Sequence, residues 1–231
     1  MPEEKRKFDW DEALSPLFRK YGRRKHPLQY KGGYELTVMV VLSSRSSDAF
    51  VNRIAPELFR AYPSLEKLSE ASPEELFPYV RGITNFRRKS QWLVGIASAL
   101  KTEPTIPVTM EELTGLPGIG RKSANVIIGE LGGKPQGVIV DLHVARVAPR
   151  LGITKSGIAD KIERDLMASV HRRHWHIAGM AMTSLGREIC RPKNPRCDEC
   201  VVNSVCGFYK RLPKREMRKV SSRREERSKK G

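Results

Sequence analysis

The chain has 231 residues, of which 39% are hydrophobic and 7% aromatic, enough to bury a core in one or two small helical domains. Its formal net charge is +17 and its isoelectric point is about 10.0, which favours a polyanionic partner such as a nucleic acid. No apolar run approaches the roughly 18 residues of a membrane span, and the charged N-terminus lacks the apolar core of a signal peptide. We therefore expect an intracellular protein that is neither membrane-bound nor secreted.

The N-terminal half shows helical periodicity. Residues 10–21 place apolar side chains at helical spacing, and Gly22 can end that helix. The apolar stretch 34–42 is compatible with a strand or with a buried helix. Because a short polar joint leads it directly into the periodic stretch 49–62, two helices are favoured.

Small polar residues mark where shorter helices can begin. Three serines occupy candidate N-cap positions, at Ser64, Ser69 and Ser72. Glu75 completes a capping box with the last of them, and Thr109 can cap a further short helix. By periodicity we expect helices over 86–100, 110–113, 123–131 and 158–171. The one strand-like run, 136–140, has no evident partner strand, so the predicted fold class is all-α.

Every cysteine of the chain lies in one short stretch, with the spacing C-x6-C-x2-C-x5-C, at Cys190, Cys197, Cys200 and Cys206. Four thiolates on a loop-rich segment can coordinate a [4Fe–4S] cluster or a tetrahedral zinc ion. Unrelated thiols or two disulfides are the alternative, which the clustering and the absence of secretory features disfavour. Structural zinc sites usually use two closely spaced pairs, so the wide first gap favours the iron–sulfur cluster.

The loop between the first two cysteines contains two prolines and three cations, Arg191, Lys193 and Arg196. A loop fixed at both ends by a metal centre and stiffened by proline would hold these cations as a phosphate-binding surface. Beyond it, residues 207–231 contain eleven Lys and Arg against three Glu. We predict that residues 212–231 form a disordered basic tail that adds non-specific affinity for nucleic acid.

Residues 113–126 contain the sequence L-P-G-I-G, which predicts a tight turn between two helices. Its glycines stand where the backbone must adopt unusual dihedral angles or approach a ligand closely. The turn would expose the free amides of the next helix, which bind phosphate. An ordinary turn between helices is the alternative to this helix–hairpin–helix. The candidate DNA-backbone contacts are Leu116, Gly118, Gly120, Arg121 and Ser123.

Lys122 and Asp141 are the candidate catalytic residues. Lys122 lies in the first turn of the helix after the hairpin, where the helix dipole and the neighbouring Arg121 disfavour its ammonium form, as an amine nucleophile requires. Asp141 ends an apolar run, so it can be partly desolvated at a cleft and stabilise a developing cation. As a single residue Asp141 can also be the N-cap of a helix over 143–150, and the two roles can coexist.

Together these elements resemble the endonuclease III family of DNA glycosylases with AP-lyase activity, from about residue 34 to 209. The shared motifs are L-S-x-x-x-x-D at 42–48, L-P-G-I-G-R-K-S-A-N at 116–125, V-D-x-H at 140–143 and the cysteine spacing. The resemblance implies two helical domains that flank a DNA-binding cleft. A six-helix barrel domain with the hairpin would span 26–134, and 1–25 with 135–211 would form the [4Fe–4S] cluster domain.

The resemblance also implies the activity, namely base excision repair by a cytoplasmic, nucleoid-associated monomer on double-stranded DNA with damaged bases or abasic sites. The Lys122 amine would displace an oxidised pyrimidine from C1′ of an extruded nucleotide, and the resulting Schiff base would permit β-elimination of the 3′ phosphate. Asp141 would assist by deprotonating Lys122 or offsetting positive charge, and the cluster would be structural. The alternatives are a mismatch or uracil glycosylase of the same superfamily and a catalytically weak DNA-binding paralogue.

Three residues near the implied lesion site depart from the family pattern and bear on substrate choice. The family usually has glutamine in place of Arg45, threonine in place of Leu142 and often an aromatic residue in place of Thr84. By position, Arg45 would contact the base opposite the lesion, and Ile83 would wedge into the duplex or else pack in the core. His143, in the V-D-x-H motif, would belong to the DNA-binding surface.

Overall fold

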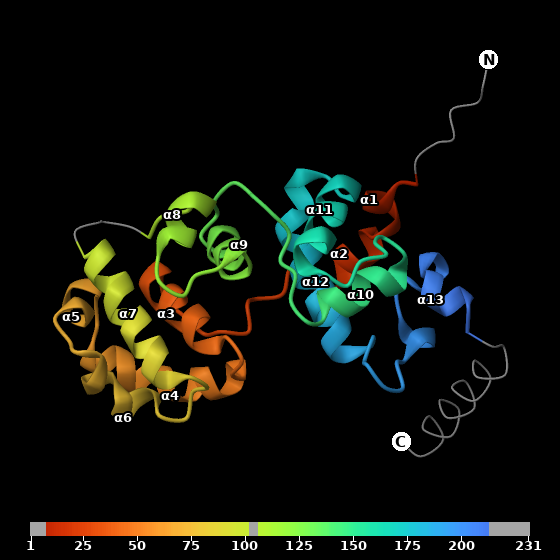
Figure 1. Ribbon diagram of the computed structural model, residues 1–231. Helices are drawn as coiled ribbons and strands as arrows, with labels where there is room; N and C mark the ends of the chain where they lie inside the picture. Colours follow the sequence, from red (N-terminus) through yellow and green to blue (C-terminus); the bar gives the residue numbers. More distant parts are fainter. Residues whose placement is uncertain (1–7, 102–105, 213–231) are drawn as a thin grey trace. The chain divides into compact units, whose positions relative to one another are not determined.

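The computed structural model describes residues 8–101 and 106–212. Contacts divide the chain into two units, one built from residues up to 24 and from 137 onward, the other from residues 25–136 (Figure 1). Within the described part every regular element is helical, which confirms the predicted all-α class, and the run 136–140 forms no strand. None of the helices in this part is both long and apolar enough to cross a membrane. The predicted basic tail lies, apart from residue 212, outside the described residues.

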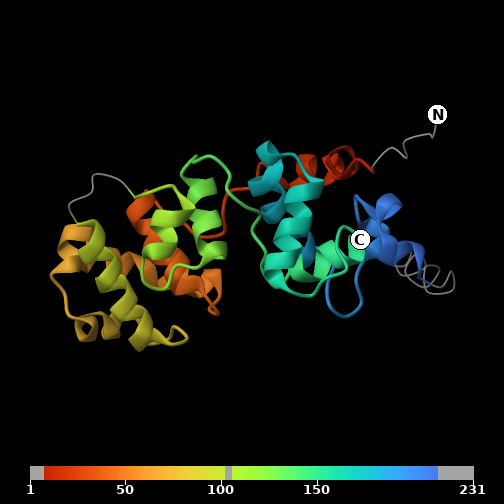
Figure 2. The same ribbon diagram turned by 45° about the horizontal axis from the view of Figure 1, so that its top comes forward.

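The unit of residues 25–136 is built around one buried helix. Its elements are α3 (Gly33–Ser43), α4 (Asp48–Ala61), α5 (Leu65–Ser69), the 3₁₀ turn η1 (Pro73–Leu76), α6 (Phe77–Val80), α7 (Phe86–Leu100), α8 (Met110–Gly115) and α9 (Arg121–Glu130). All residues of α3 from 36 to 42 are buried, because α4, α7 and α9 pack around it, and α5 lies along α7 (Figures 1 and 2). A helix that is apolar on all sides is buried in a core. The stretch 34–42 is therefore a buried helix and not a strand.

The predicted capping residues are mostly confirmed in this unit. The Ser64 and Thr109 side chains each accept a hydrogen bond from a first-turn amide, and Ser72 forms the expected capping box with Glu75. The predicted cap at Ser69 is wrong, because this residue ends α5 and its hydroxyl donates to the carbonyl of residue 66, 2.7 Å away. Helix α7 has the predicted bounds.

The second unit joins the start of the chain to its C-terminal part. Its elements are α1 (Trp10–Ala13), α2 (Ser15–Tyr21), α10 (Val144–Leu151), α11 (Ala159–Ser169), the 3₁₀ turns η2 (Arg172–His174), η3 (Cys197–Glu199) and η4 (Asn203–Val205), α12 (Trp175–Glu188) and α13 (Gly207–Lys210). The predicted helix over 10–21 is divided at Leu14, because Pro16 cannot donate the backbone hydrogen bond that would continue it. Gly22 caps its end as predicted.

The core of this unit is formed where α2 and α10 pack against α12. Leu14, Leu17 and Tyr21 from the N-terminal helices are buried among apolar residues of α10, α11 and α12. The Tyr21 hydroxyl donates to the Glu188 carboxylate over 3.2 Å, and Arg24 forms an ion pair with the same carboxylate. This packing gives the cysteine segment, which follows α12 directly, a rigid base.

Candidate functional site

The L-P-G-I-G turn connects α8 to α9 and is anchored by apolar side chains. Leu116 and Ile119 are 9% and 4% exposed. Gly118 has φ +75°, and a Cβ atom built on it would lie 2.4 Å from the Trp92 ring, so both backbone and space require glycine here. Gly120 is the N-cap residue of α9, and a Cβ atom on it would meet nothing within 4 Å. The turn thus leaves the first amides of α9 open to a ligand.

Two adjacent cations occupy the first turn of α9. Arg121 and Lys122 are exposed, Ser123 is half-buried, and no acidic residue lies in this turn. The next five residues, 124–128, are buried, which fixes the helix against the core of the unit. Two cations at the positive end of a helix dipole oppose folding slightly but suit the binding of phosphate. The Lys122 amine is therefore held on a rigid element and is accessible from solvent.

Asp141 follows a buried segment of the other unit and caps α10. Its Oδ1 atom accepts hydrogen bonds from the amides of His143 at 2.8 Å and Val144 at 2.9 Å, so the predicted capping role is confirmed. The side chain is half-buried, and within the described residues its Oδ2 atom has no hydrogen-bond partner. Asp141 thus has one oxygen committed to structure and one available for another partner.

The V-D-x-H segment is linked to the start of the cysteine segment by Arg146. Its guanidinium contacts His143 Nδ1 at 3.1 Å and donates to the carbonyls of Cys190 and Gly186, each at 2.9 Å. Burial lowers the pKa of His143, and the cations nearby act in the same direction. A neutral His143 is therefore favoured, in a position fixed by α10 and α12.

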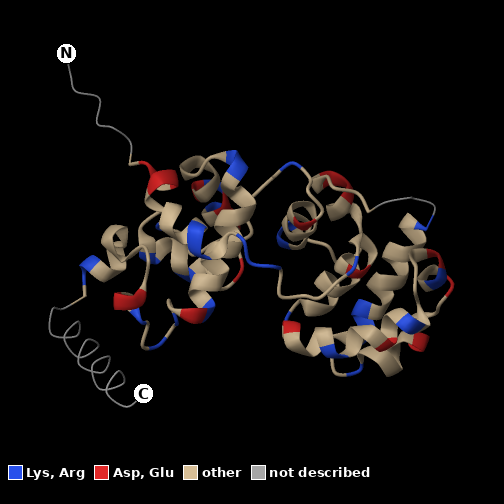
Figure 3. Cartoon of the chain, turned by 180° about the vertical axis from the view of Figure 1, so that it is seen from behind, with Lys and Arg blue, Asp and Glu red and all other residues tan. Residues whose placement is uncertain are grey.

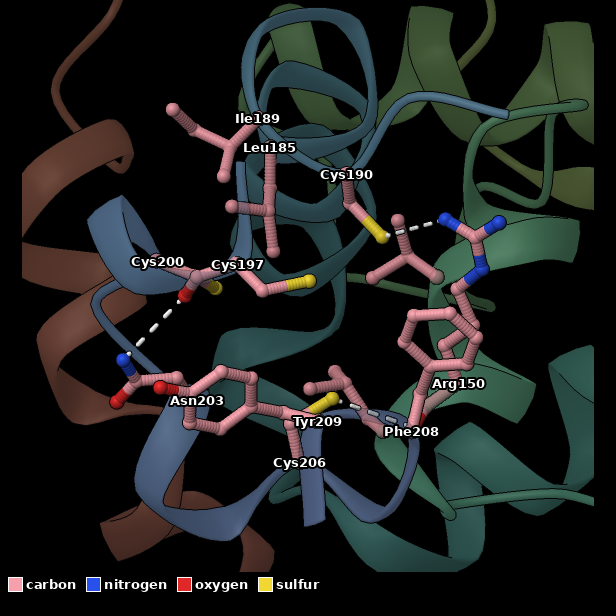
Figure 4. A pocket seen from close by; sticks show the side chains of 12 residues that line it. Arg150, Leu185, Ile189, Cys190, Cys197, Cys200, Asn203, Cys206, Phe208 and Tyr209 are labelled. Carbon is pink, nitrogen blue, oxygen red and sulfur yellow. Dashed lines mark hydrogen bonds between the residues drawn. The ribbon is translucent and has the colours of Figure 1, made fainter. Parts of the chain in front are cut away.

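The four cysteines line one pocket, in which about 350 Å³ is not filled by protein atoms, a volume that includes open solvent (Figure 4). All four are free thiols, and Cys206 is buried. Burial raises the pKa of both Cys197 and Cys200 to about 11, and the neighbouring thiols add to this. Four thiolates so close together need a positive centre to offset their charge, and the donor set is the one that a [4Fe–4S] cluster or zinc requires.

The arrangement of the four thiols can be compared with what each metal centre requires. Within the part of the chain that is described, no three His, Cys, Asp or Glu side chains converge as ligands of one ion. In Figure 4 the four sulfur atoms instead surround the cavity. A cluster with several iron atoms binds each thiolate at a different iron, so its ligands surround a space instead of meeting at a point. Four thiols around one pocket therefore fit a [4Fe–4S] cluster.

Arg150 is a central residue of this cavity that no sequence motif indicated. From the last turn of α10 its guanidinium contacts Cys190 Sγ at 3.4 Å and donates to the carbonyls of Arg191 at 2.8 Å and Pro192 at 3.3 Å. It also lies 4.6 Å from the centre of the Phe208 ring (Figure 4). Arg150 thus fixes the beginning of the cationic loop to α10 and places positive charge beside the thiols.

The three predicted cations of the loop have different environments. Arg191 and Lys193 are exposed, as a phosphate-binding surface requires. Arg196 is half-buried, and its guanidinium binds Glu199 at 2.9 Å and the Glu188 carbonyl at 2.8 Å. These contacts hold the base of the loop, and the side chain of Arg196 is 41% exposed, so its phosphate contact stays a prediction. Figure 3 shows lysine and arginine spread over helices and loops of both units.

Of the residues that the family resemblance assigns to the lesion site, some are exposed and one is buried. Arg45 is exposed, and its backbone has φ +60°. Ile83 is 2% exposed, which contradicts an exposed wedge and agrees with the alternative of core packing. Leu142 is 70% exposed, beside Asp141. Lys122 and Asp141 themselves belong to different units, the first to residues 25–136 and the second to the unit that begins again at 137.

Comparison with known proteins gives one consistent family. The model of the HhH-GPD superfamily of base excision DNA repair proteins matches residues 38–172. Endonuclease III of Thermotoga maritima is 33% identical over 192 residues, which cover 82% of this chain and 90% of that protein. A structure of a non-covalent endonuclease III–DNA complex has a TM-score of 0.79 at 30% identity and covers 90% of this chain and 96% of that chain.

A structure of a trapped endonuclease III–DNA covalent intermediate is similar as well, with a TM-score of 0.77, 30% identity, and coverage of 86% of this chain and 94% of that chain. The family match and these relatives show a base excision repair DNA glycosylase. The chain belongs to the endonuclease III family of the HhH-GPD superfamily.

Proposed function

We propose that the protein is a bifunctional glycosylase that removes oxidised pyrimidines from duplex DNA and cuts the strand by AP-lyase chemistry, with Lys122 as nucleophile. The observation that carries the proposal is the position of Lys122, an exposed amine in the first turn of α9, immediately after a hairpin whose turn requires Gly118. An amine delivered by the same element that grips the DNA backbone attacks the sugar next to the bound phosphate.

The chemistry follows from an amine and a carboxylate. Lys122 Nζ forms a bond to C1′ of the extruded nucleotide. The glycosidic bond between C1′ and the base nitrogen breaks, and the base leaves with a proton. The C1′–O4′ bond then breaks, O4′ takes up a proton, and the resulting iminium between C1′ and Nζ acidifies the C2′ proton. Loss of that proton and of the 3′ phosphate cuts the strand. Among the described residues the Asp141 Oδ2 atom has no hydrogen-bond partner, which suits it to accept a proton from Lys122 or to stabilise positive charge on the sugar.

The two units supply different DNA contacts in this proposal. The unit of residues 25–136 is the barrel domain, in which the α9 amides, Gly120 and Arg121 bind phosphate. The other unit is the cluster domain, in which Cys190, Cys197, Cys200 and Cys206 hold a [4Fe–4S] cluster. The cluster, when bound, supplies a structural cross-link, and Arg191 and Lys193 on the loop that it fixes contact phosphate. The enzyme acts as a monomer on DNA with damaged bases or abasic sites.

Reductive trapping tests the nucleophile directly. With sodium borohydride and a duplex that contains an abasic site or thymine glycol, the protein is expected to form one covalent adduct, because borohydride reduces a Schiff base to a stable amine. Proteolysis and mass spectrometry are expected to locate the adduct on the peptide that contains Lys122. An adduct on a different lysine, or no adduct under conditions where the damaged duplex is bound, contradicts the proposal.

A specific observation favours a second substrate class. Leu142 is 70% exposed beside Asp141, and an exposed apolar side chain can contact the methyl group of thymine. The second candidate is therefore a glycosylase for mismatched thymine. A panel of duplexes with thymine glycol, uracil, and thymine opposite guanine separates the two. The proposal expects the fastest excision of thymine glycol, and faster excision of mismatched thymine favours the alternative.

Substitution of Asp141 separates its capping role from its chemical role. Asn is as good an N-cap as Asp, so Asp141→Asn is expected to keep the thermal unfolding midpoint, whereas Asp141→Ala is expected to lose about 1 kcal/mol of stability. Both variants lose the carboxylate charge and are expected to slow base excision by about 100-fold in single-turnover kinetics. If Asp141→Asn excises at the wild-type rate, the carboxylate serves only as a cap.

A further inference from the structure

Lys89 on α7 is a buried lysine that the proposed chemistry does not use. Its side chain is 2% exposed, and Nζ donates to the carbonyl oxygens of Leu42 at 2.8 Å and Ser44 at 2.5 Å. Both acceptors lie at the C-terminal end of α3, where free carbonyls and the negative end of the helix dipole attract a cation. In the described part of the chain no carboxylate forms a salt bridge with it.

A buried ammonium without an anionic partner is unfavourable by itself. Burial and, as the smaller cause, the nearby charge of Arg45 together lower the pKa of Lys89 to about 8. Such a group is retained in a fold when its hydrogen bonds fix a geometry that an apolar residue cannot fix. The geometry in question is that of the turn after α3, since the two carbonyls lie on either side of residue 43.

That turn contains a strained residue. Arg45 has φ +60°, a left-handed conformation that is unfavourable by about 1 kcal/mol for a residue with a Cβ atom. The turn is held on both sides of it, by Lys89 through the Ser44 carbonyl and by Thr84. The Thr84 hydroxyl donates to the Arg45 carbonyl at 2.9 Å, and the Thr84 amide donates to Ser46 Oγ at 3.2 Å.

The Arg45 side chain is therefore exposed, and the backbone that carries it is restrained on both sides. The like charge of Lys89 beneath it favours orientations of the guanidinium that point away from the core. Lys89 reaches the turn from α7, which is fixed to α5 and η1 by packing. A buried cation on a rigid helix therefore restrains the backbone of the turn that carries Arg45.

We propose that Lys89 is a positioning residue for Arg45, and that by clamping the Ser44 carbonyl it sets the affinity for damaged duplexes and the preference among bases opposite the lesion. The proposal rests on the proposed function and on the prediction from the family resemblance that Arg45 contacts the base opposite the lesion. A pre-positioned side chain loses less conformational freedom on binding, which is why the clamp increases affinity.

The test uses Lys89→Met, which keeps the length of the side chain and removes its donors. Dissociation constants are measured by fluorescence anisotropy on duplexes with a stable tetrahydrofuran abasic site opposite each of the four bases, and on undamaged duplex. We expect affinity for the abasic duplexes to fall about tenfold, the effect of one lost charge-assisted contact. We also expect the differences among opposite bases to shrink and binding to undamaged duplex to stay within about twofold.

A matched control removes a buried polar group from the first half of α3, away from the C-terminal end that Lys89 contacts. Thr37 is 1% exposed, and its hydroxyl donates to the Gly33 carbonyl at 2.8 Å. Thr37→Val is expected to leave both the dissociation constants and the opposite-base preference unchanged. Lys89→Arg keeps the charge and the donors and is expected to recover part of the lost affinity.

A double-mutant cycle with Arg45→Ala distinguishes positioning from general stability. If Lys89 acts through Arg45, Lys89→Met has no further effect on the dissociation constants in the Arg45→Ala background. Equal losses in both backgrounds, or wild-type constants and preference in Lys89→Met, overturn the proposal. If thermal denaturation shows that Lys89→Met is unfolded at the assay temperature, Thr84→Val replaces it, because it releases the same turn from an exposed position. The same loss and the same dependence on Arg45 are then expected.

These measurements require binding only, so they are independent of the lyase chemistry. If wild-type protein forms no borohydride adduct while Lys89→Met still weakens binding through Arg45, the proposed function is wrong and the positioning role stands. If the adduct forms at Lys122 and the cycle is additive, the proposed function stands and the positioning role is wrong.

Discussion

Replacing Lys122 with glutamine is expected to slow base release and strand cleavage at least about 1,000-fold in single-turnover kinetics at saturating enzyme. Glutamine has a comparable reach but no nucleophilic amine, so the covalent intermediate cannot form. The fold is expected to survive, because Lys122 is exposed and the turn before it is anchored by Leu116 and Ile119. The borohydride adduct is expected to disappear, while the dissociation constant for abasic duplex changes by no more than about threefold.

The neighbouring cation is the matched control for this substitution. Arg121→Gln removes one charge from the same exposed turn of α9 but leaves the amine. It is expected to weaken DNA binding a few-fold, to reduce the slope of log K against log[salt] by about one, and to retain the adduct. Should Lys122→Gln retain adduct formation at the wild-type rate, the nucleophile is a different amine.

The sequence predicted well those features that depend on neighbouring residues. Helix α7 has the bounds that periodicity gave, and Ser72 with Glu75 forms the predicted capping box, because both depend on contacts within a few residues. The wrong cap at Ser69 arose from the same local reasoning, since a serine that ends one short helix resembles a serine that begins the next. The choice between strand and helix for α3 was open until the packing of its neighbours was known.

The candidate site shows the same division between local and distant contacts. The cysteine spacing and the hairpin motif lie within short segments, so their residues could be named from sequence. Arg150 and Lys89 could not, because their partners lie 40 or more residues away in the chain. For the same reason the burial of Ile83 was not decided by its motif, which is compatible with a wedge and with a core residue.

Loss of the proposed cluster is the other change for which we expect a large effect, here on stability and DNA affinity. The cysteine segment contains little regular secondary structure. Between Cys190 and Lys210 its regular elements are the short turns η3 and η4 and the four-residue helix α13. Apart from the bond from the Arg196 amide to the Ile189 carbonyl, its backbone hydrogen bonds join residues at most five apart, so the proposed cluster would supply much of the free energy that orders it. Cys197→Ser is expected to abolish the visible absorption of the purified protein, together with its iron and acid-labile sulfide.

The same variant is expected to lower the thermal unfolding midpoint by roughly 10 °C, which corresponds to about 2 kcal/mol for a unit of this size. Its affinity for DNA is expected to fall by about tenfold or more, because Arg191 and Lys193 are no longer held in place. Ser204→Ala changes an exposed residue between two of the ligands and is the control, expected to match wild type in iron content, stability and affinity. Zinc in place of iron and sulfide in the wild-type protein would contradict the cluster.

Trapping then tells whether the cluster takes part in bond breaking. Lys122 lies in the unit of residues 25–136, which contains none of the cysteines. If the cluster only orders the loop that contacts phosphate, Cys197→Ser forms the borohydride adduct at saturating DNA with a rate near that of wild type, and only the DNA concentration for half-maximal trapping rises. A trapping rate that falls at saturation as strongly as in Lys122→Gln would instead assign the metal centre a direct part in the reaction.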